Sequence, residues 1–184
     1  MKITKTNLED CFVIEPEIYK DERGSFLESF NQRIFQEKTG LSVHFIQDNQ
    51  STSQYGVVRG LHMQKGEYAQ AKLVRVVKGS VLDVVVDTRE NSATFGESFS
   101  CILSEKNNKQ LFIPKGFLHG FATLEEDTIF SYKCDNYYNK QSETGVIYND
   151  EFLNINWKLI ESDIILSQKD KKLQSFKAFM NRNK

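Results

Sequence analysis

Between residues 73 and 86 the chain reads LVRVVKGSVLDVVV, two valine-rich runs joined by a lysine, a glycine and a serine. Valine is β-branched, and such side chains favour extended strands. The second run, Val81–Val86, is apolar at nearly every residue, which predicts a strand buried on both faces. Gly79 can adopt the positive φ of a tight turn. We therefore expect Leu73–Val77 and Val81–Val86 to form a β-hairpin.

Short strand-like runs recur along the chain, separated by polar residues or glycine. They cover Phe12–Ile14, Ser25–Phe30, His44–Ser51, Val57–Met63, Lys72–Val77, Val81–Asp87, Ser98–Leu103, Lys109–Ile113 and Thr128–Lys133. Regular short strands of this kind predict an all-β sandwich or barrel. One helix is predicted from Asn31 to Lys38, with Asn31 as N-cap and Gly40 near the C-cap. The polar tail from Asp150 is expected to wrap the barrel in short helical turns.

Length, charge and cysteine content narrow the class of protein. The 184 residues suit one domain, so residues 1–184 are expected to form a single unit. A net charge of −1 leaves no basic excess for a nucleic-acid backbone, and no apolar run approaches the ~18 residues of a membrane span. Cys11, Cys101 and Cys134 are odd in number and lack CxxC spacing, which indicates reduced thiols. With no apolar segment at the N-terminus, we expect a cytoplasmic protein.

A first polar cluster lies at residues 59–64, which read RGLHMQ. Strand alternation would place His62 and Gln64 on one face, and Leu61 and Met63 on the other. If the Leu61 face packs on the core, His62 faces a cavity or solvent. Arg59 and Gln64 nearby favour a barrel mouth that receives a polar ligand, and a hydrogen-bonded structural histidine is the alternative.

A second cluster lies at residues 113–121, which read IPKGFLHGF. A proline and two glycines predict a strained loop, and such loops often carry functional residues. His119 in this loop is then a second candidate for the site. The alternative is a tight turn with a partly buried histidine.

Neither a metal nor a cofactor is predicted. The chain has three histidines, and Gln64 stands where a metal-binding cupin places its second histidine ligand. The sequence has no GxGxxG motif and no P-loop for a nucleotide cofactor. The chemistry is therefore expected to come from side chains alone.

Four side chains could together move protons beside a carbonyl group. Such chemistry needs a base, a donor for the enolate oxygen and an acid, roles that suit His62, Lys72 and Tyr132. Asp170 could orient His62 and stabilise its imidazolium. Taken alone, Asp170 lies within a run of lysines, Lys169–Lys172, and would be interpreted as a solvated charge.

Read together, the motifs resemble the dTDP-4-dehydrorhamnose 3,5-epimerase family from about Ile3 to Lys171. The matching segments, in order, are Asp21–Phe30, Phe45–Ser51, Val58–Gln64, Ala69–Gly79, Ile113–Phe121, Tyr132–Tyr138 and Ile165–Asp170. The resemblance implies a jelly-roll, cupin-like barrel without metal or cofactor. It also implies a homodimer that shares strands, and a dTDP-linked 4-keto-6-deoxy sugar as substrate.

The resemblance also implies a role for each site residue. His62 would be the base with Asp170 as its partner, Tyr132 the acid, and Lys72 the donor to the enolate. The substrate would be bound by a larger set: Arg23 and Arg59 on the diphosphate, His119 on the sugar, Gln47, Asn49 and Glu28 on the nucleotide, Phe26 and Tyr138 on the thymine, and Glu143 and Lys169. Arg23, Phe26 and Glu28 would act on the neighbouring subunit's site.

One segment departs from the family pattern. The family carries prolines after His-x-Gln, whereas this chain has Lys65-Gly66-Glu67-Tyr68, and Met63 replaces an aromatic residue. The departure bears on whether C3 and C5 are both inverted, and inversion of both is expected. The alternatives are a single-site 3- or 5-epimerase of a related nucleotide sugar, a non-catalytic sugar-nucleotide-binding cupin, and a metal-dependent cupin oxygenase or isomerase.

Overall fold

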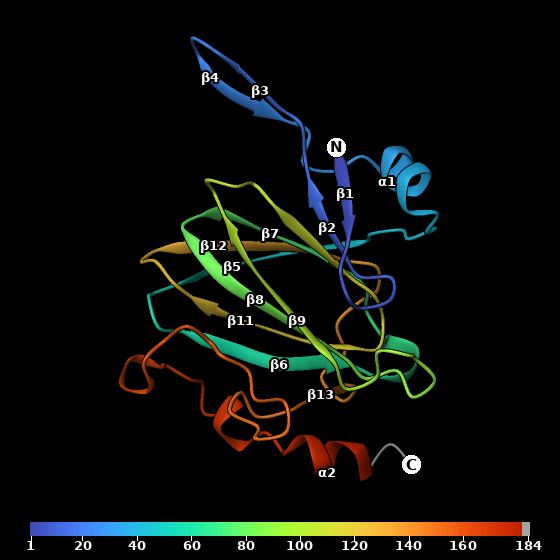
Figure 1. Cartoon of the computed structure of the whole chain (residues 1–184), viewed down its shortest axis with the longest axis vertical. Coiled ribbons are helices and arrows are strands. Elements are labelled where there is room, and N and C mark those ends of the chain that lie inside the picture. Colours follow the sequence, from blue (N-terminus) through green and yellow to red (C-terminus); the bar gives the residue numbers. More distant parts are fainter. Residues whose placement is uncertain (182–184) are drawn as a thin grey trace.

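Two antiparallel β-sheets pack face to face in a computed structural model that describes residues 1–181 (Figure 1). The six-stranded sheet contains, in spatial order, β1 (Lys2–Lys5), β2 (Phe12–Glu15), β10 (Gln110–Ile113), β7 (Lys72–Lys78), β12 (Thr128–Cys134) and β5 (Gln47–Ser53). The five-stranded sheet contains β13 (Glu143–Gly145), β6 (Val58–Gln64), β11 (Phe117–Thr123), β8 (Ser80–Asp87) and β9 (Ser98–Ser104). The predicted all-β sandwich is confirmed, and each predicted strand overlaps an observed one.

The predicted hairpin between β7 and β8 is wrong. The chain does turn at Gly79, where φ is +80°, but the two strands belong to opposite sheets. Strand β8 pairs with β11 and β9, and all of its residues are buried, as predicted. Val81 and Val85 of β8 pack in the core between the sheets, and Leu82, Val84 and Val86 pack in a second apolar cluster on the outer face of the five-stranded sheet. Burial therefore decides its partners, and the Lys78-Gly79-Ser80 turn forms a corner of the sandwich.

The predicted loop at residues 113–121 is also wrong beyond Gly116. From Phe117 the chain forms β11, a fully buried strand between β6 and β8. A Cβ added at Gly120 would lie 2.6 Å from the Arg59 carbonyl oxygen, so this glycine permits the close approach of β6. The glycine therefore serves strand packing rather than a turn.

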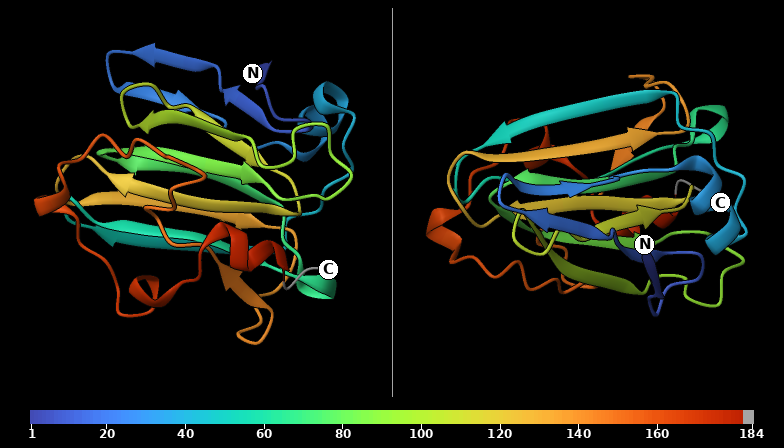
Figure 2. Two further views of the ribbon diagram at one scale, coloured as in Figure 1. Left: turned by 60° about the horizontal axis from the view of Figure 1, so that its bottom comes forward. Right: turned by 90° about the horizontal axis from the view of Figure 1, so that it is seen from above.

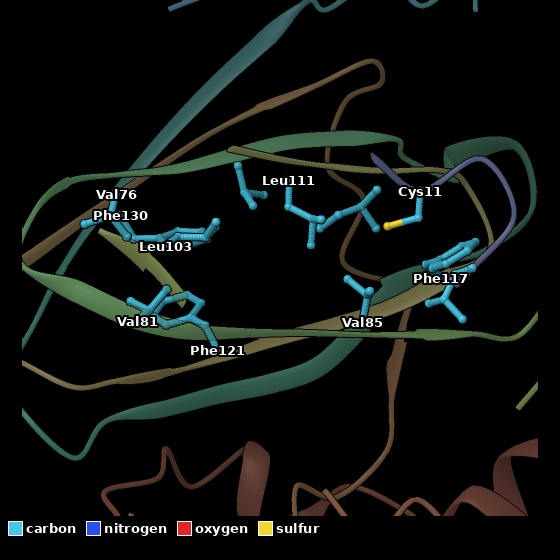
Figure 3. Packing of buried hydrophobic residues seen from close by; sticks show 12 residues of the cluster. Cys11, Val76, Val81, Val85, Leu103, Leu111, Phe117, Phe121 and Phe130 are labelled. Carbon is cyan, nitrogen blue, oxygen red and sulfur yellow. The ribbon is translucent and has the colours of Figure 1, made fainter. Parts of the chain in front are cut away.

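The main core lies between the two sheets (Figure 3). Val76 and Leu111 reach it from the six-stranded sheet, and Val81 and Phe121 from the five-stranded sheet. Phe121 stacks on Phe130 with the ring centroids 4.2 Å apart. Phe121 and Phe130 also border a cavity whose other walls carry polar side chains.

The C-terminal segment covers the outer face of the five-stranded sheet (Figure 2). It contains two 3₁₀ turns, η2 (Glu161–Asp163) and η3 (Asp170–Lys172), and the short helix α2 (Phe176–Asn181). Its side chains Trp157 and Phe179 pack with Leu82 and Leu118 of the sheet in one apolar cluster. The expected wrapping tail of short helical turns is confirmed, and it brings η3 to one end of β6.

The N-terminal part covers the other sheet and forms an arm. Helix α1 (Gln32–Thr39) has Asn31 as its N-cap, and the Asn31 side chain accepts a hydrogen bond from the Ile34 amide. Its C-cap is the left-handed Gly40, and both caps are as predicted. Before it, β3 (Ile18–Asp21) and β4 (Gly24–Leu27) pair only with each other. This two-stranded arm projects away from the sandwich (Figure 1).

Candidate active site

A cavity of about 520 Å³ opens between the two sheets. Its walls come from β6 and β11 on one side, β7 and β12 on the other, and the C-terminal segment. It is lined by all four proton-transfer candidates and by three of the predicted substrate-binding residues: His62, Lys72, Tyr132, Asp170, Arg59, His119 and Lys169. Residues from positions 59 to 170 thus meet at one place.

His62 faces this cavity because β6 carries a bulge. His119 of β11 pairs with His62 and Phe121 pairs with Arg59, so one residue of β11 opposes two of β6. Strict alternation would have placed Arg59 on the opposite face from His62, whereas the bulge lets both line the cavity. Leu61 packs on the other side, under the C-terminal segment, as predicted.

Asp170 and His62 form a close pair. Nε2 of His62 lies 2.5 Å from Oδ1 of Asp170, and Asp170 is only 4% exposed. Burial opposes ionisation of Asp170, but the hydrogen bond to His62 and the charges of His62 and Lys169 hold the pKa of the carboxyl below its ordinary value. The interpretation of Asp170 as a solvated charge is therefore wrong. Its lysine neighbours are exposed, but the η3 turn directs this one side chain inward.

Lys72 and Tyr132 lie on the opposite sheet from His62. The Lys72 ammonium is 5.9 Å from the centre of the Tyr132 ring. Burial lowers the pKa of Lys72, and burial raises the pKa of the Tyr132 phenol. A phenol with a raised pKa keeps its proton near neutral pH, as a general acid must. The cavity thus has a histidine–carboxylate pair on one side and a protonated phenol on the other.

His119 is held by a carboxylate that the sequence argument did not select. Its Nε2 lies 3.0 Å from Oδ2 of Asp83, and both side chains are buried. Asp83 is the only charged residue between Val81 and Val86, so a lone carboxylate in an apolar strand was the available signal. Phe121 and Phe130, which line the cavity with their stacked rings, were also missed.

A polar cluster at residues 138–169 borders the site. The Tyr138 hydroxyl donates to Glu143 at 2.8 Å, and the Lys169 ammonium reaches the same carboxylate at 2.5 Å. Burial opposes ionisation of Glu143, but hydrogen bonds from Lys169 and Tyr138 hold the pKa of the carboxyl below its ordinary value. The Tyr138 ring is exposed and free to meet an aromatic base.

The remaining nucleotide-binding candidates lie near the site or on the arm. Arg59 donates to Ser53 Oγ from Nε and Nη2, and Gln47 donates to Asn49 at 3.0 Å. The Gln47 side chain also accepts from the Tyr138 amide, which ties β5 to the Tyr138–Lys169 cluster.

Arg23, Phe26 and Glu28 are not brought to the cavity of their own chain. Arg23 and Phe26 lie on the β3–β4 arm, where Phe26 is 69% exposed and Arg23 forms an ion pair with Asp21. Glu28 follows the arm and accepts from Asn31. Three substrate-binding candidates thus face solvent in the single chain.

Residues 1–181 contain neither a cluster of metal-ligating side chains nor a membrane-spanning helix. No three His, Cys, Asp or Glu side chains in this range gather closely enough to hold a metal ion. None of the helices in the same range is long and apolar enough to cross a bilayer.

Comparison with known proteins identifies the family. The sequence model of the family described as dTDP-4-dehydrorhamnose 3,5-epimerase matches residues 5–178. The enzyme of that name from Escherichia coli K12 is 49% identical over 173 residues, 94% of this chain and 93% of the relative. The chain belongs to the dTDP-4-dehydrorhamnose 3,5-epimerase family.

Solved structures of this family share the fold of the chain. The crystal structure of the dTDP-4-dehydrorhamnose 3,5-epimerase of Elizabethkingia anophelis has a TM-score of 0.93 at 55% identity and covers 97% of both chains. That of the dTDP-6-deoxy-D-glucose-3,5-epimerase of Legionella pneumophila, in complex with dTDP-4-keto-L-rhamnose, has a TM-score of 0.91 at 46% identity. It covers 95% of this chain and 92% of its own. The cupin-like fold implied by the resemblance is therefore confirmed.

The segment that departs from the family pattern lies outside the cavity. Gly66–Tyr68 forms the 3₁₀ turn η1, and no residue from 65 to 68 lines the cavity wall. The Asn136 amide donates to the Glu67 carbonyl at 2.7 Å, and Gln70 donates to the Asn136 carbonyl at 2.8 Å. Hydrogen bonds thus hold this loop in place.

Proposed function

We propose that the protein is the 3,5-epimerase of dTDP-4-dehydro-6-deoxy-D-glucose, acting in the synthesis of dTDP-L-rhamnose. The observation that carries the proposal is the placement of His62 and Tyr132 on opposite sheets, facing one cavity. Inversion of a carbon needs a base on one face of the sugar ring and an acid on the other. Family membership supports the same reaction.

The chemistry needs only side chains. His62, paired with Asp170, takes a proton from C3 or C5, and the electron pair of the broken C–H bond forms an enolate with the C4 ketone. The Lys72 ammonium stabilises the charge that develops on the C4 oxygen. Tyr132 then returns a proton from the opposite face, and the carbon is inverted.

The nucleotide is proposed to bind along the edge of the cavity. Arg59 holds the diphosphate, because a guanidinium group matches phosphate oxygens. Tyr138 stacks on the thymine, while the Glu143 and Lys169 side chains fix its position. Gln47 and Asn49 contact the nucleotide from β5, and His119 contacts the sugar.

The active unit is proposed to be a homodimer in which the β3–β4 arm completes the partner's site. The arm carries exposed Arg23 and Phe26, followed by Glu28, and among residues 1–181 its two strands pair with no other strand. Exposed aromatic and arginine side chains on a projecting hairpin suit contact with a second subunit.

Proton NMR in deuterated water tests the reaction. We expect the C3 and C5 proton signals of dTDP-4-keto-6-deoxyglucose both to disappear, and His62→Ala to abolish the exchange. Exchange at one carbon alone would move the assignment to a single-site epimerase. Binding without any exchange would indicate a different keto-sugar or a binding role.

Mixing two inactive variants tests the shared site. Arg23→Ala and His62→Ala each damage a different half of the composite site. In a mixed dimer, one of the two sites keeps both native residues. After subunit exchange, we expect about a quarter of native activity to return, since half of the dimers are mixed and each has one intact site. No recovery in a verified mixed dimer would refute action in trans.

A cytoplasmic location is also proposed. Cys11, Cys101 and Cys134 are free thiols, and unpaired cysteines suit a reducing compartment. Cell fractionation with an antibody to the protein checks this, and recovery from an extracytoplasmic fraction would contradict it.

A further inference from the structure

A buried serine lies behind Arg59. Ser53 is the last residue of β5, is 6% exposed and does not line the cavity. Its Oγ accepts hydrogen bonds from Nε of Arg59 at 3.3 Å and from Nη2 at 3.2 Å. Among residues 1–181 this hydroxyl has no other hydrogen-bond partner. The structure thus commits one buried hydroxyl to one guanidinium group.

The contact between Ser53 and Arg59 bridges the two sheets. Ser53 belongs to the six-stranded sheet and Arg59 to the five-stranded sheet, where the β6 bulge lets it line the cavity. An arginine side chain has many rotamers, and an acceptor on the facing sheet selects few of them. The Ser53 contact therefore fixes where the guanidinium lies.

The guanidinium keeps both charge and donors for a ligand. Arginine has five N–H donors, and the contacts with Ser53 use those of Nε and one of Nη2. Across the described part of the chain no carboxylate pairs with Arg59, whereas Arg89 is paired with Asp87. A guanidinium held by one edge can offer its other edge to an anion, and two parallel N–H donors match phosphate oxygens.

Ser53 also continues a polar row on the inner face of β5. Ser51 pairs directly with Phe130 of β12, and both residues line the cavity. Side chains alternate along a strand, so Asn49 and Ser53 share the inner face with Ser51. The proposed nucleotide contact at Asn49 and the hydroxyl that holds Arg59 therefore lie on one face of one strand.

We propose that Ser53 is a positioning residue, which holds the Arg59 guanidinium in place to receive the diphosphate of the nucleotide. The inference rests on the proposed dTDP-linked substrate. A guanidinium that is already held loses less conformational freedom when the ligand binds. Ser53 should therefore raise the affinity for the diphosphate, and should do so only through Arg59.

A double-mutant cycle on dTDP binding tests the proposal. The Kd of dTDP would be measured by calorimetry for the native protein, Ser53→Ala, Arg59→Ala and the double variant. We expect Ser53→Ala to weaken binding about 3- to 10-fold, and to have no further effect when Arg59 is already alanine. An unchanged Kd in Ser53→Ala would overturn the proposal. Full additivity of the two effects would also overturn it, because Ser53 would then act independently of Arg59.

Ser53→Thr and Ser104→Ala are the matched controls. Threonine keeps the hydroxyl and suits a strand, so Ser53→Thr should keep the native affinity. Ser104 is also 6% exposed at the end of a strand, and its hydroxyl accepts from the Asn107 amide away from the cavity. Ser104→Ala should leave the Kd unchanged, even if the protein melts at a lower temperature. A loss as large as that of Ser53→Ala in either control would refute the role of the Ser53 hydroxyl.

Two further readouts separate the proposal from folding and from the epimerase function. The ¹⁵N order parameter of the Arg59 Nε–H in the native protein, assigned with Arg59→Lys, needs no serine variant. A value below about 0.6, typical of a mobile group, would overturn the proposal even if Ser53→Ala failed to fold. Failure of the native protein to bind dTDP would overturn it as well. Binding of dTDP without deuterium exchange into the keto-sugar would instead reject the epimerase function, while the cycle would still report on Ser53.

Discussion

Asp170→Asn removes the charge beside His62 and preserves the shape of the side chain. In the native protein Oδ1 of Asp170 lies 2.5 Å from His62 Nε2, and the Asp170 side chain is buried. In the proposed mechanism His62 takes a proton from the sugar, and the carboxylate would stabilise the resulting imidazolium. An asparagine offers a neutral oxygen, so His62 becomes a weaker base.

The size of the effect follows from the hydrogen bond. A hydrogen bond to a charged group contributes about 1.5 to 3 kcal/mol. Each 1.36 kcal/mol of lost transition-state stabilisation slows a reaction about tenfold. If the whole contribution is lost when the proton is transferred, kcat/KM should fall by about 10- to 150-fold.

The assay is deuterium incorporation at C3 and C5, followed by proton NMR. Circular dichroism of the same samples verifies the fold. Asp163→Asn is the matched control, because Asp163 lies on the same C-terminal segment and contacts the Tyr55 hydroxyl outside the cavity. We expect this control to keep native activity. If Asp170→Asn retained activity within about twofold of native, the carboxylate would not support the base, and the reasoning would fail.

Three further predictions concern the edge of the site, the strand contact and acid stability. Glu143→Gln should weaken dTDP binding about tenfold by calorimetry, because one carboxylate no longer holds Tyr138 and Lys169; an unchanged Kd would contradict this. Gly120→Ala should destabilise the fold by about 1 to 3 kcal/mol in a urea titration, since its Cβ would overlap the Arg59 carbonyl, and native stability would refute the packing argument. The folded pKa of Asp170 lies below its unfolded value of about 3.9, so its stabilising contribution is complete above that pH and is lost as the pH falls through the folded pKa. The Tm of Asp170→Asn should accordingly fall less steeply than the native Tm on acidification below about pH 5, and parallel curves would count against it.

Local signals in the sequence predicted the elements whose form depends on near neighbours. The β-branched runs gave most of the strands, and the Asn31 cap and Gly40 bounded the one predicted helix. The proton-transfer candidates were found because a base, a cation and an acid are chemically distinctive. Their meeting in one cavity supports that selection, while the role of each residue stays a prediction.

Contacts between distant segments decided what the sequence could not predict. The turn at Gly79 suits a hairpin or a corner equally, and burial of β8 on both faces selected the corner. Asp170 meets His62 across 108 residues, and its immediate neighbours are exposed lysines. Its burial therefore follows from the path of the C-terminal segment, which no local pattern records.

The corner at Gly79 joins β7 of the six-stranded layer, which carries Lys72, to β8 of the five-stranded layer, and the proton-transfer candidates are divided between these two layers. His62 belongs to the five-stranded layer and Tyr132 to the six-stranded one, so their separation is the gap between layers. A compact state with intact strands but loosened side chains would widen this gap. Turnover would then vanish while the far-ultraviolet dichroism of the strands persisted. Loss of turnover would therefore report loosened tertiary packing in a state whose strand content is unchanged.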